Sequence, residues 1–301
     1  KKNKIKNFIF FTNINIFNNY LKKYKINLPT NLINKITLSK KQQLKNKFNI
    51  MSFKAKNKNE NTMNSLKLSY QYTKKFQFKG LLTLPLNKEN IIKTGFHNFT
   101  GHTEFFESID NAKVSNMIFI KDKIIFSTIT THVKLQKVPY ILRSKNFIIN
   151  KLKCMNKSLN EDFNIKKPKI LISGLNPHSG ENGAIGDEEI KFIIPAINKL
   201  KRLKVHIVGP VSADSMISKK NIRSFDSLIF MYHDQALIPF KYISQFSGVN
   251  YTGNLEIIRT SPDHGTAYNL VGSKNISDKS ILNCYKLIKK IHKNRMLHGS
   301  A

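Results

Sequence analysis

The chain has 301 residues, 40% of them hydrophobic, and carries a formal net charge of +33 at pH 7. A chain of this length can bury a large core, in one domain or in two that pack closely. No apolar stretch reaches the roughly 18 residues of a membrane-spanning helix. The charge comes mainly from lysines spread along the chain, without the basic and aromatic clusters typical of nucleic-acid binding. We therefore expect neither a membrane nor a nucleic acid as a partner.

The first fifty residues alternate short apolar stretches with stretches rich in Lys and Asn, and residues 7–12 predict a strand. Residues 54–64 are polar and low in complexity, and predict a loop. From residue 65 onward, β-branched runs alternate with helical patterns, which predicts a layered α/β fold with a largely parallel core. Apolar residues at helical spacing predict helices over residues 187–203 and 280–296.

Three strand-like runs of the α/β region are each followed by a histidine. The pairs are residues 123–131 with His132, residues 170–172 with His178, and residues 227–232 with His233. Because the carboxyl ends of neighbouring parallel strands meet at one edge of a sheet, these histidines are expected to lie near one another. Three imidazoles with an open coordination position suit a catalytic divalent metal. A lone histidine is more often an ordinary surface or core residue, so the spacing alone leaves both interpretations open.

Residues 174–189 (GLNPHSGENGAIGDEE) crowd four glycines, a proline and His178 into a crossing from strand to helix. Ligands bind at such crossings in α/β folds, and glycines let backbone N–H groups approach them closely. An ordinary glycine-rich turn that ends in a helix N-cap explains the same residues equally well.

Several segments, in a fixed order, resemble the 4-hydroxythreonine-4-phosphate dehydrogenase family of pyridoxal phosphate (vitamin B6) biosynthesis. They are residues 99–106 (FTGHTEFF), 130–132 (TTH), 174–189, 231–235 (MYHDQ), 248–250 (GVN) and 259–267 (RTSPDHGTA). The resemblance implies two α/β domains around a cleft, like those of isocitrate and isopropylmalate dehydrogenases and unlike the classical Rossmann fold. The chain indeed has no G-x-G-x-x-G motif. Residues 1–100 and 253–301 would form the first domain, and residues 101–252 the second.

The resemblance also implies an activity. Members oxidise 4-phosphooxy-L-threonine with NAD to 2-amino-3-oxo-4-phosphooxybutanoate, which decarboxylates to 3-amino-2-oxopropyl phosphate. A paralogue acting on another phosphorylated four-carbon hydroxy acid, or a decayed basic protein without catalysis, is the alternative. Members act as homodimers with the site at the interface. Cys154 and Cys284 have no metal-binding or redox spacing, which is typical of a cytoplasmic protein.

The resemblance assigns roles to individual residues of this chain. A divalent metal (Zn, Mg or Co) is expected on His132, His178 and His233. The substrate is expected on His102, Thr103, Lys241, Asn250 and Arg259, and the adenosine part of NAD on His264, Gly265, Thr266 and Ala267. Lys241, Asp234 and Asp214 are expected to be catalytic, the two carboxylates by orienting a metal-bound histidine. The family opens with a G-D-P-x-G-I-G-P-like loop that this sequence lacks, which predicts a truncated or eroded N-terminus.

Overall fold

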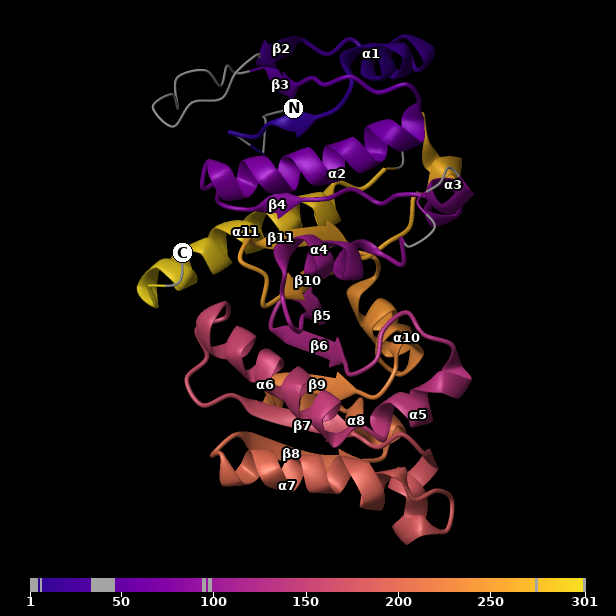
Figure 1. Ribbon diagram of the computed structural model, residues 1–301, viewed down its shortest axis with the longest axis vertical. Coiled ribbons are helices and arrows are strands. Elements are labelled where there is room, and N and C mark those ends of the chain that lie inside the picture. Colours follow the sequence, from indigo (N-terminus) through magenta and orange to yellow (C-terminus); the bar gives the residue numbers. More distant parts are fainter. Residues whose placement is uncertain are drawn as a thin grey trace.

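The computed structural model describes residue 5 and residues 7–33, 47–93, 96, 99–273 and 276–299. Figure 1 labels the main strands and helices of these residues. The strands are β1 (Phe10–Phe11), β2 (Thr30–Ile33), β3 (Phe48–Met51), β4 (Leu81–Leu82), β5 (Asn116–Lys121), β6 (Ile124–Thr128), β7 (Lys169–Ser173), β8 (His206–Val211), β9 (Ser227–Phe230), β10 (Val249–Gly253) and β11 (Arg259–Pro262). The helices are α1 (Ile14–Lys23), α2 (Lys58–Lys75), α3 (Lys88–Lys93), α4 (His102–Asp110), α5 (Val138–Leu142), α6 (Lys145–Glu161), α7 (Ile194–Arg202), α8 (Ala213–Met216), α9 (Lys219–Ser224), α10 (His233–Ser244) and α11 (Lys279–Leu297).

The strands form two sheets. A parallel three-stranded sheet has the order β1-β3-β2, and an eight-stranded sheet has the order β4-β11-β10-β5-β6-β9-β7-β8, which runs from top to bottom in Figure 1. The strands β6, β9, β7 and β8 are parallel, as expected, whereas the pairs β5–β6, β5–β10 and β10–β11 are antiparallel. The predicted α/β fold is thus confirmed. The larger sheet continues across the boundary expected at residue 253, and the division into two domains stays a prediction.

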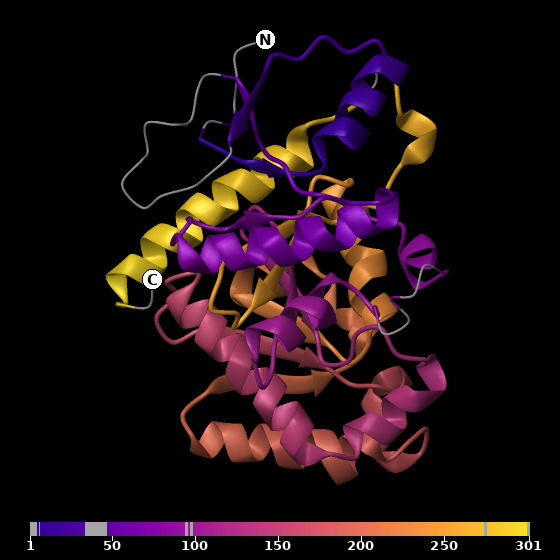
Figure 2. The same cartoon turned by 45° about the horizontal axis from the view of Figure 1, so that its top comes forward.

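Both faces of the larger sheet are covered. Along β5, Ile118 points into one hydrophobic cluster and Phe119 into another, because successive strand residues face opposite sides. The first cluster is closed by α6, α7 and α11, and the second by α10. Figures 1 and 2 show α11 running across the molecule, where it packs against β4, β10 and β11. No helix within the described ranges is long and apolar enough to cross a membrane.

The predicted loop over residues 54–64 is confirmed for residues 54–57 and wrong from Lys58 onward, where α2 begins. The side chain of Asn57 accepts hydrogen bonds from the backbone N–H groups of Asn59 and Glu60, which caps the helix. Met63 and Leu66 then begin a buried stripe. The polar composition hid this cap from the sequence interpretation. The helices predicted over residues 187–203 and 280–296 are confirmed, as residues 189–202 and 279–297.

Candidate metal and substrate site

The strand ends that precede His132 and His233 lie side by side. β6 and β9 are parallel neighbours, and their pairing continues past both strands. The backbone N–H of Ile129 donates to the carbonyl of Phe230 (2.8 Å), and the Thr130 hydroxyl donates to the carbonyl of Met231 (2.8 Å). Because these bonds hold the two chains in register up to the histidines, the predicted meeting at one sheet edge is confirmed for this pair.

The rings of His132 and His233 have centroids 5.7 Å apart and planes 47° apart. Nδ1 of His132 lies 2.9 Å from Oε1 of Glu104, and Nδ1 of His233 lies 2.7 Å from Oδ1 of Asp234. A carboxylate can only accept a hydrogen bond, so each Nδ1 carries the hydrogen. In the neutral form of each ring the lone pair is then on Nε2, the form in which imidazole binds a metal.

His178 lies in a left-handed turn, Pro177–Gly183, in which His178, Ser179, Glu181 and Asn182 all have positive φ. Its side chain is exposed. Within the described part of one chain, no group of three His, Cys, Asp or Glu side chains could hold a metal ion. One chain therefore pairs two of the expected ligands, and the three-histidine set stays a prediction.

Glu189 holds the base of this turn. It is buried, and its Oε1 accepts hydrogen bonds from the backbone N–H groups of Leu175 (2.7 Å) and Asn176 (2.8 Å). A Cβ atom on Gly174 or Gly180 would lie 2.9 or 2.7 Å from the Glu189 carboxylate oxygens. Two of the four glycines of the predicted ligand loop, Gly174 and Gly180, thus pack closely against a buried carboxylate, which the sequence interpretation missed.

Gln235, also missed, ties β9 to the start of the same turn. Its Oε1 accepts from the N–H of Met231 (3.0 Å), and its Nε2 donates to the carbonyls of Gly174 (3.2 Å) and Leu175 (3.4 Å). One amide side chain therefore links the histidine-bearing end of β9 to the end of β7. Its place in the matched segment 231–235 (MYHDQ) was the signal in the sequence, but no role was assigned to it.

Arg259 lies deep in the protein, with 1% of its surface exposed. Its guanidinium donates to hydroxyl groups alone: Thr83 (3.0 and 2.7 Å), Thr252 (3.1 Å) and Ser261 (2.9 Å). Burial lowers the pKa of Arg259 to about 9, which still leaves it protonated at neutral pH. In the described residues this cation has hydroxyls but no carboxylate against it, an environment that favours an anion supplied from outside.

His102 lies next to this cation. The His102 ring stacks on the Phe106 ring with the planes 5° apart. The Arg259 guanidinium lies 5.6 Å from the centre of the Phe106 ring. Burial, followed by the charge of Arg259, holds the pKa of His102 well below its usual value. The His102 Nε2 atom is buried and has no hydrogen-bond partner among the described residues. Thr103 is buried beside it in the first turn of α4.

Asp263 follows β11, which pairs with β10, the strand that carries Asn250. Burial raises the pKa of Asp263, and the hydrogen bond from the Ser244 hydroxyl (3.3 Å) and then the charge of Lys241 oppose this rise. The Oδ1 atoms of Asn250 and Asp263 are both buried without a partner in the described residues. A buried oxygen without a hydrogen-bond partner lowers the stability of the fold, and a ligand that donates a hydrogen bond to it would remove this cost.

The two carboxylates expected to orient a histidine have different surroundings. Asp234 contacts His233, as expected. Asp214 is exposed, and its carboxylate accepts a hydrogen bond from the N–H of Ser215 in the same helix. Its proposed catalytic role has no support from these contacts.

The expected cofactor loop is held by His264. Its Nδ1 lies 2.9 Å from the carbonyl of Gly265, and its Nε2 lies 3.0 Å from the hydroxyl of Ser280. Both ring nitrogens of His264 therefore make contacts within the chain, one to the loop and one to the start of α11. A Cβ atom on Gly265 would meet nothing within 4 Å, and Ala267 is exposed. Gly265 and Ala267 are thus exposed, and Thr266 between them is half-buried.

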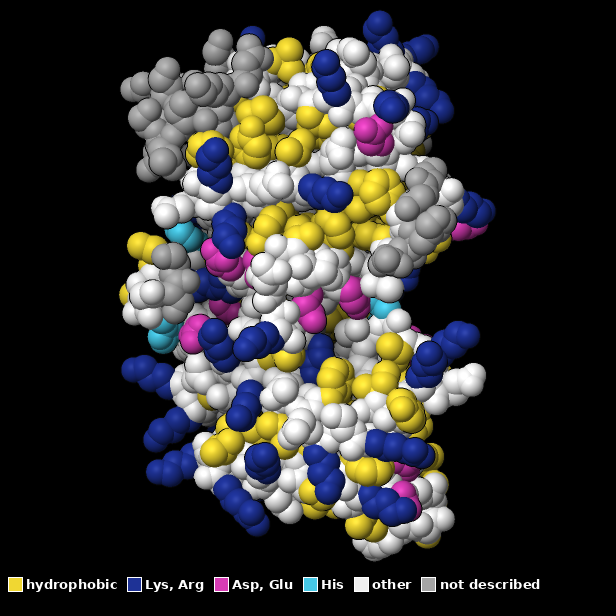
Figure 3. Space-filling model, viewed as in Figure 1, with side chains coloured by type: hydrophobic (Ala, Val, Ile, Leu, Met, Phe, Trp, Pro, Cys, Tyr) yellow, Lys and Arg dark blue, Asp and Glu magenta, His cyan; other side chains and the backbone are white. Residues whose placement is uncertain are grey.

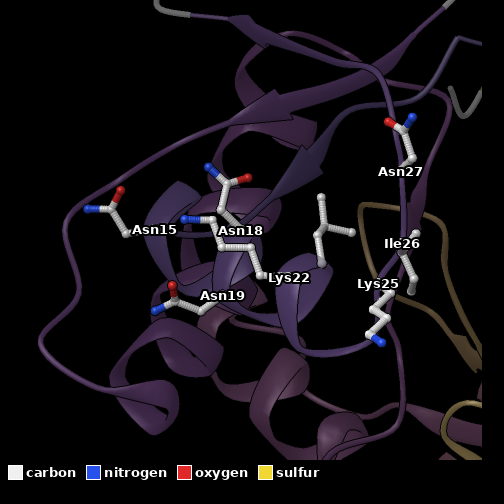
Figure 4. Close-up of a pocket in the computed structure, with 8 residues that line it drawn as sticks. Asn15, Asn18, Asn19, Lys22, Lys25, Ile26 and Asn27 are labelled. Carbon is white, nitrogen blue, oxygen red and sulfur yellow. The ribbon is translucent and has the colours of Figure 1, made fainter.

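Two surface cavities lie away from these residues. One, of about 600 Å³, is lined by amides and lysines of α1 and the segment that follows it, as Figure 4 shows. Another, of about 690 Å³, is lined by the hairpin between β5 and β6 together with parts of α9 and α11. Figure 3 shows Lys and Arg side chains scattered over one face, with apolar and uncharged surface between them. Such scatter fits a compositional origin of the charge.

Several curated relatives of the chain share one name. The chain is similar to the 4-hydroxythreonine-4-phosphate dehydrogenase of Sulfurihydrogenibium sp. (strain YO3AOP1), with 42% identity over 66% of this chain and 61% of that protein. It is similar to the enzyme of Aquifex aeolicus (strain VF5), with 40% identity over 69% and 64%. The match thus spans less than two thirds of these relatives' own length.

Solved structures show the same fold. The crystal structure of 4-hydroxythreonine-4-phosphate dehydrogenase from Klebsiella pneumoniae matches with a TM-score of 0.79 and 24% identity, over 94% of this chain and 88% of that one. The model of the family described as "Pyridoxal phosphate biosynthetic protein PdxA" matches residues 4–288. With nearly its whole length matched, the chain belongs to the pyridoxal phosphate biosynthetic protein PdxA family.

Proposed function

We propose that this chain is a metal-dependent dehydrogenase that oxidises 4-phosphooxy-L-threonine with NAD, in the synthesis of pyridoxal phosphate. One observation carries the proposal: His102 stacks on the Phe106 ring, over which the buried Arg259 guanidinium lies, and it follows Gly101, whose backbone lies against the His132 ring. The pKa of His102 is lowered by burial, then by Arg259, and also by His132, while Glu104 opposes the shift. The charges of both Arg259, the candidate phosphate-binding residue, and His132, the candidate metal ligand, therefore act on His102. A short molecule with a phosphate at one end and a hydroxyl at the other would bridge them.

The histidine pair fits a transition metal. His132 and His233 would hold the ion through Nε2, and His178 would complete the set. Imidazole ligands favour zinc or cobalt over magnesium, which prefers oxygen. When bound, the ion supplies Lewis acidity at the substrate hydroxyl and NAD supplies the hydride acceptor.

The substrate would be oriented by the residues around the cation. Arg259 offers its remaining Nη1 hydrogen and its charge to the phosphate. His102 would contact the substrate through Nε2, beside the buried Thr103. Lys241 and Asn250 would contact it from α10 and β10, and Lys241 is the candidate proton carrier.

The cofactor would bind through the loop Gly265–Ala267, whose exposed backbone and small side chains leave room for an adenosine group. His264 would act indirectly, by holding the loop against Ser280 at the start of α11.

We also propose that the active form is a homodimer with the site at the interface. Large apolar side chains are exposed beyond the histidine-bearing strand ends: Tyr140 (71%), Ile238 (71%), Tyr242 (80%) and Phe246 (60%). Ile238 and Tyr242 lie four residues apart on α10, so they share one face of that helix. A second copy would cover this surface and would bring its own His178 turn towards the histidine pair.

Mixing two inactive variants tests this shared site. If one copy supplies His132 and His233 and the other supplies His178, a mixed dimer of His132→Ala and His178→Ala has one intact site and one doubly damaged site. Mixing should then restore activity and one tight Zn²⁺ site per dimer, which neither variant shows alone. No recovery in a verified mixed dimer would refute sharing.

The free, buried thiols of Cys154 and Cys284 support a cytoplasmic location as part of the same proposal.

The activity is tested with purified protein, 4-phosphooxy-L-threonine, NAD and either Zn²⁺ or Co²⁺, by following NADH absorbance. We expect NADH to form with metal and to stop after chelation. Another phosphorylated four-carbon hydroxy acid, assayed in parallel, distinguishes the paralogous activity. Folded, metal-loaded protein that forms no NADH with either substrate would refute the dehydrogenase.

A further inference from the structure

A carboxylate from a different helix supports the histidine pair. Glu104 lies in the first turn of α4, and its side chain reaches the residues that follow β6. Its Oε1 accepts a hydrogen bond from Nδ1 of His132 (2.9 Å) and another from the hydroxyl of Thr131 (3.0 Å). Oε1 of Glu104 therefore bonds two consecutive residues, Thr131 and His132, and these bonds restrain both the position and the rotation of the imidazole.

The other side of the carboxylate is closed by backbone. Oε2 of Glu104 is buried and has no hydrogen-bond partner among the described residues. A Cβ atom on Gly101 would lie 2.7 Å from this oxygen and 3.0 Å from Nδ1 and Cε1 of His132. Only glycine at this position lets carboxylate and imidazole sit against the chain. The G-H-T-E segment thus has a packing reason for both its first and its last residue.

The contact decides which nitrogen of His132 is available. Because the carboxylate accepts from Nδ1, the neutral His132 ring has its lone pair on Nε2, and the contact with Asp234 selects the same tautomer in His233. The two supports differ in burial: the Glu104 side chain is 29% exposed and that of Asp234 is 70% exposed. Water screens the Asp234 contact more, so the Glu104 contact is the firmer of the two.

We propose that Glu104 is the positioning residue for His132, which selects its tautomer and holds its ring ready for a metal ion. The metal itself rests on the proposed function above. Glu104 touches neither substrate nor cofactor in this assignment, and it acts only through the imidazole. Partners of this kind commonly change metal affinity about 10- to 100-fold.

The test compares Glu104→Gln and Glu104→Leu with Glu107→Gln in the full chain. Gln keeps an oxygen acceptor for Nδ1 but loses the charge, and Leu loses both. Glu107 lies one turn further along α4, and its carboxylate accepts from the backbone N–H of Ser115 (3.2 Å), away from the histidines. The readouts are Zn²⁺ affinity by calorimetry and the His132 tautomer by ¹⁵N NMR of the metal-free protein.

We expect Zn²⁺ affinity to fall about 10-fold in Glu104→Gln and about 100-fold in Glu104→Leu, with Glu107→Gln unchanged. His132 should carry its hydrogen on Nδ1 in the unaltered protein and lose this preference in Glu104→Leu. Equal Zn²⁺ affinity in all variants, or a wild-type His132 protonated on Nε2, would overturn the positioning role. Unaltered protein that binds neither Zn²⁺ nor Co²⁺ would instead refute the proposed metal dependence, while the tautomer measurement still tests Glu104. If Glu104→Leu fails to fold, Glu104→Gln and the wild-type tautomer give the answer.

Discussion

His132 and His233 come from distant parts of the chain, yet their ring centroids lie only 5.7 Å apart. Hydrogen bonds between the ends of β6 and β9, just before the two histidines, explain this closeness. The Thr130 hydroxyl and backbone N–H both bond the carbonyl of Met231, so the two strand ends cannot shift relative to each other without breaking two bonds. The histidine pair is therefore a property of strand register, which makes it sensitive to residues that never touch a ligand.

Gln235→Leu tests this dependence. The substitution removes the bonds to Met231, Gly174 and Leu175 and leaves buried backbone groups unpaired. We expect the free energy of unfolding to fall by about 1–3 kcal/mol and Zn²⁺ affinity to fall with it. Gln71→Leu, at an exposed position of α2, should change stability by less than about 0.5 kcal/mol. Denaturant unfolding and calorimetry measure both, and equal effects of the two substitutions would contradict the role of Gln235.

Gly180→Ala tests the packing of the His178 turn. A Cβ atom there would lie 2.5 Å from the carbonyl of Gly186 and 2.7 Å from Glu189, at a φ of +79°. We expect the turn to rearrange, with loss of metal binding and a free energy of unfolding lower by roughly 1–3 kcal/mol. Gly265→Ala is the matched control, because its Cβ meets nothing within 4 Å. It should keep Zn²⁺ affinity and stability, and a raised KM for NAD in this control alone would support the cofactor loop. Unchanged Zn²⁺ affinity in Gly180→Ala would show that the turn does not carry a ligand.

Arg259→Lys tests the buried cation. An ammonium group cannot reproduce the forked contacts to Thr83, Thr252 and Ser261, and each bond of a charged donor is worth about 1.5–3 kcal/mol. We expect a lower melting temperature and a strongly raised KM for the phosphorylated substrate. Arg223→Lys, at an exposed position of α9, should change neither. If KM stays the same in folded Arg259→Lys protein, Arg259 is a structural cation outside the substrate site.

The thiols predict a pH dependence of stability. Burial raises the pKa of both Cys154 and Cys284 to about 12, from 9.0 for an unperturbed thiol. The native protein should therefore not react with a thiol reagent at neutral pH, whereas denatured protein should react at both residues. Since the folded pKa is raised, the contribution is complete below pH 9 and is lost as the pH rises from 9 to 12.

At pH 10 the loss amounts to about 1.4 kcal/mol for each thiol, one pKa unit of proton linkage. A Cys154→Ala/Cys284→Ala double variant should lose less stability than the unaltered protein between pH 8 and pH 10. Parallel pH profiles of unfolding free energy for the two proteins, or rapid labelling of the native protein, would contradict this burial.

Much of the candidate site could be predicted from the sequence, because its signals are local. A β-branched run that ends in a histidine predicts both a strand and the position of the imidazole at its carboxyl end, and β6, β7 and β9 follow those runs. The amphipathic stretches that became α7 and α11 were equally local. The family resemblance rested on short motifs of the same kind.

What the sequence could not determine is which side chains meet across the fold. The start of α2 depended on one asparagine cap inside a polar run, and polarity had suggested a loop. Glu104 supports His132 only because α4 packs against the end of β6, and Gln235 joins two strand ends only because β9 lies beside β7. The depth of Arg259, and its hydroxyl partners from β10, β11 and the segment after β4, likewise come from the packing of distant segments. Local periodicity determined the elements of this protein, whereas burial and contacts between distant residues, which depend on the whole folded chain, decided their chemistry.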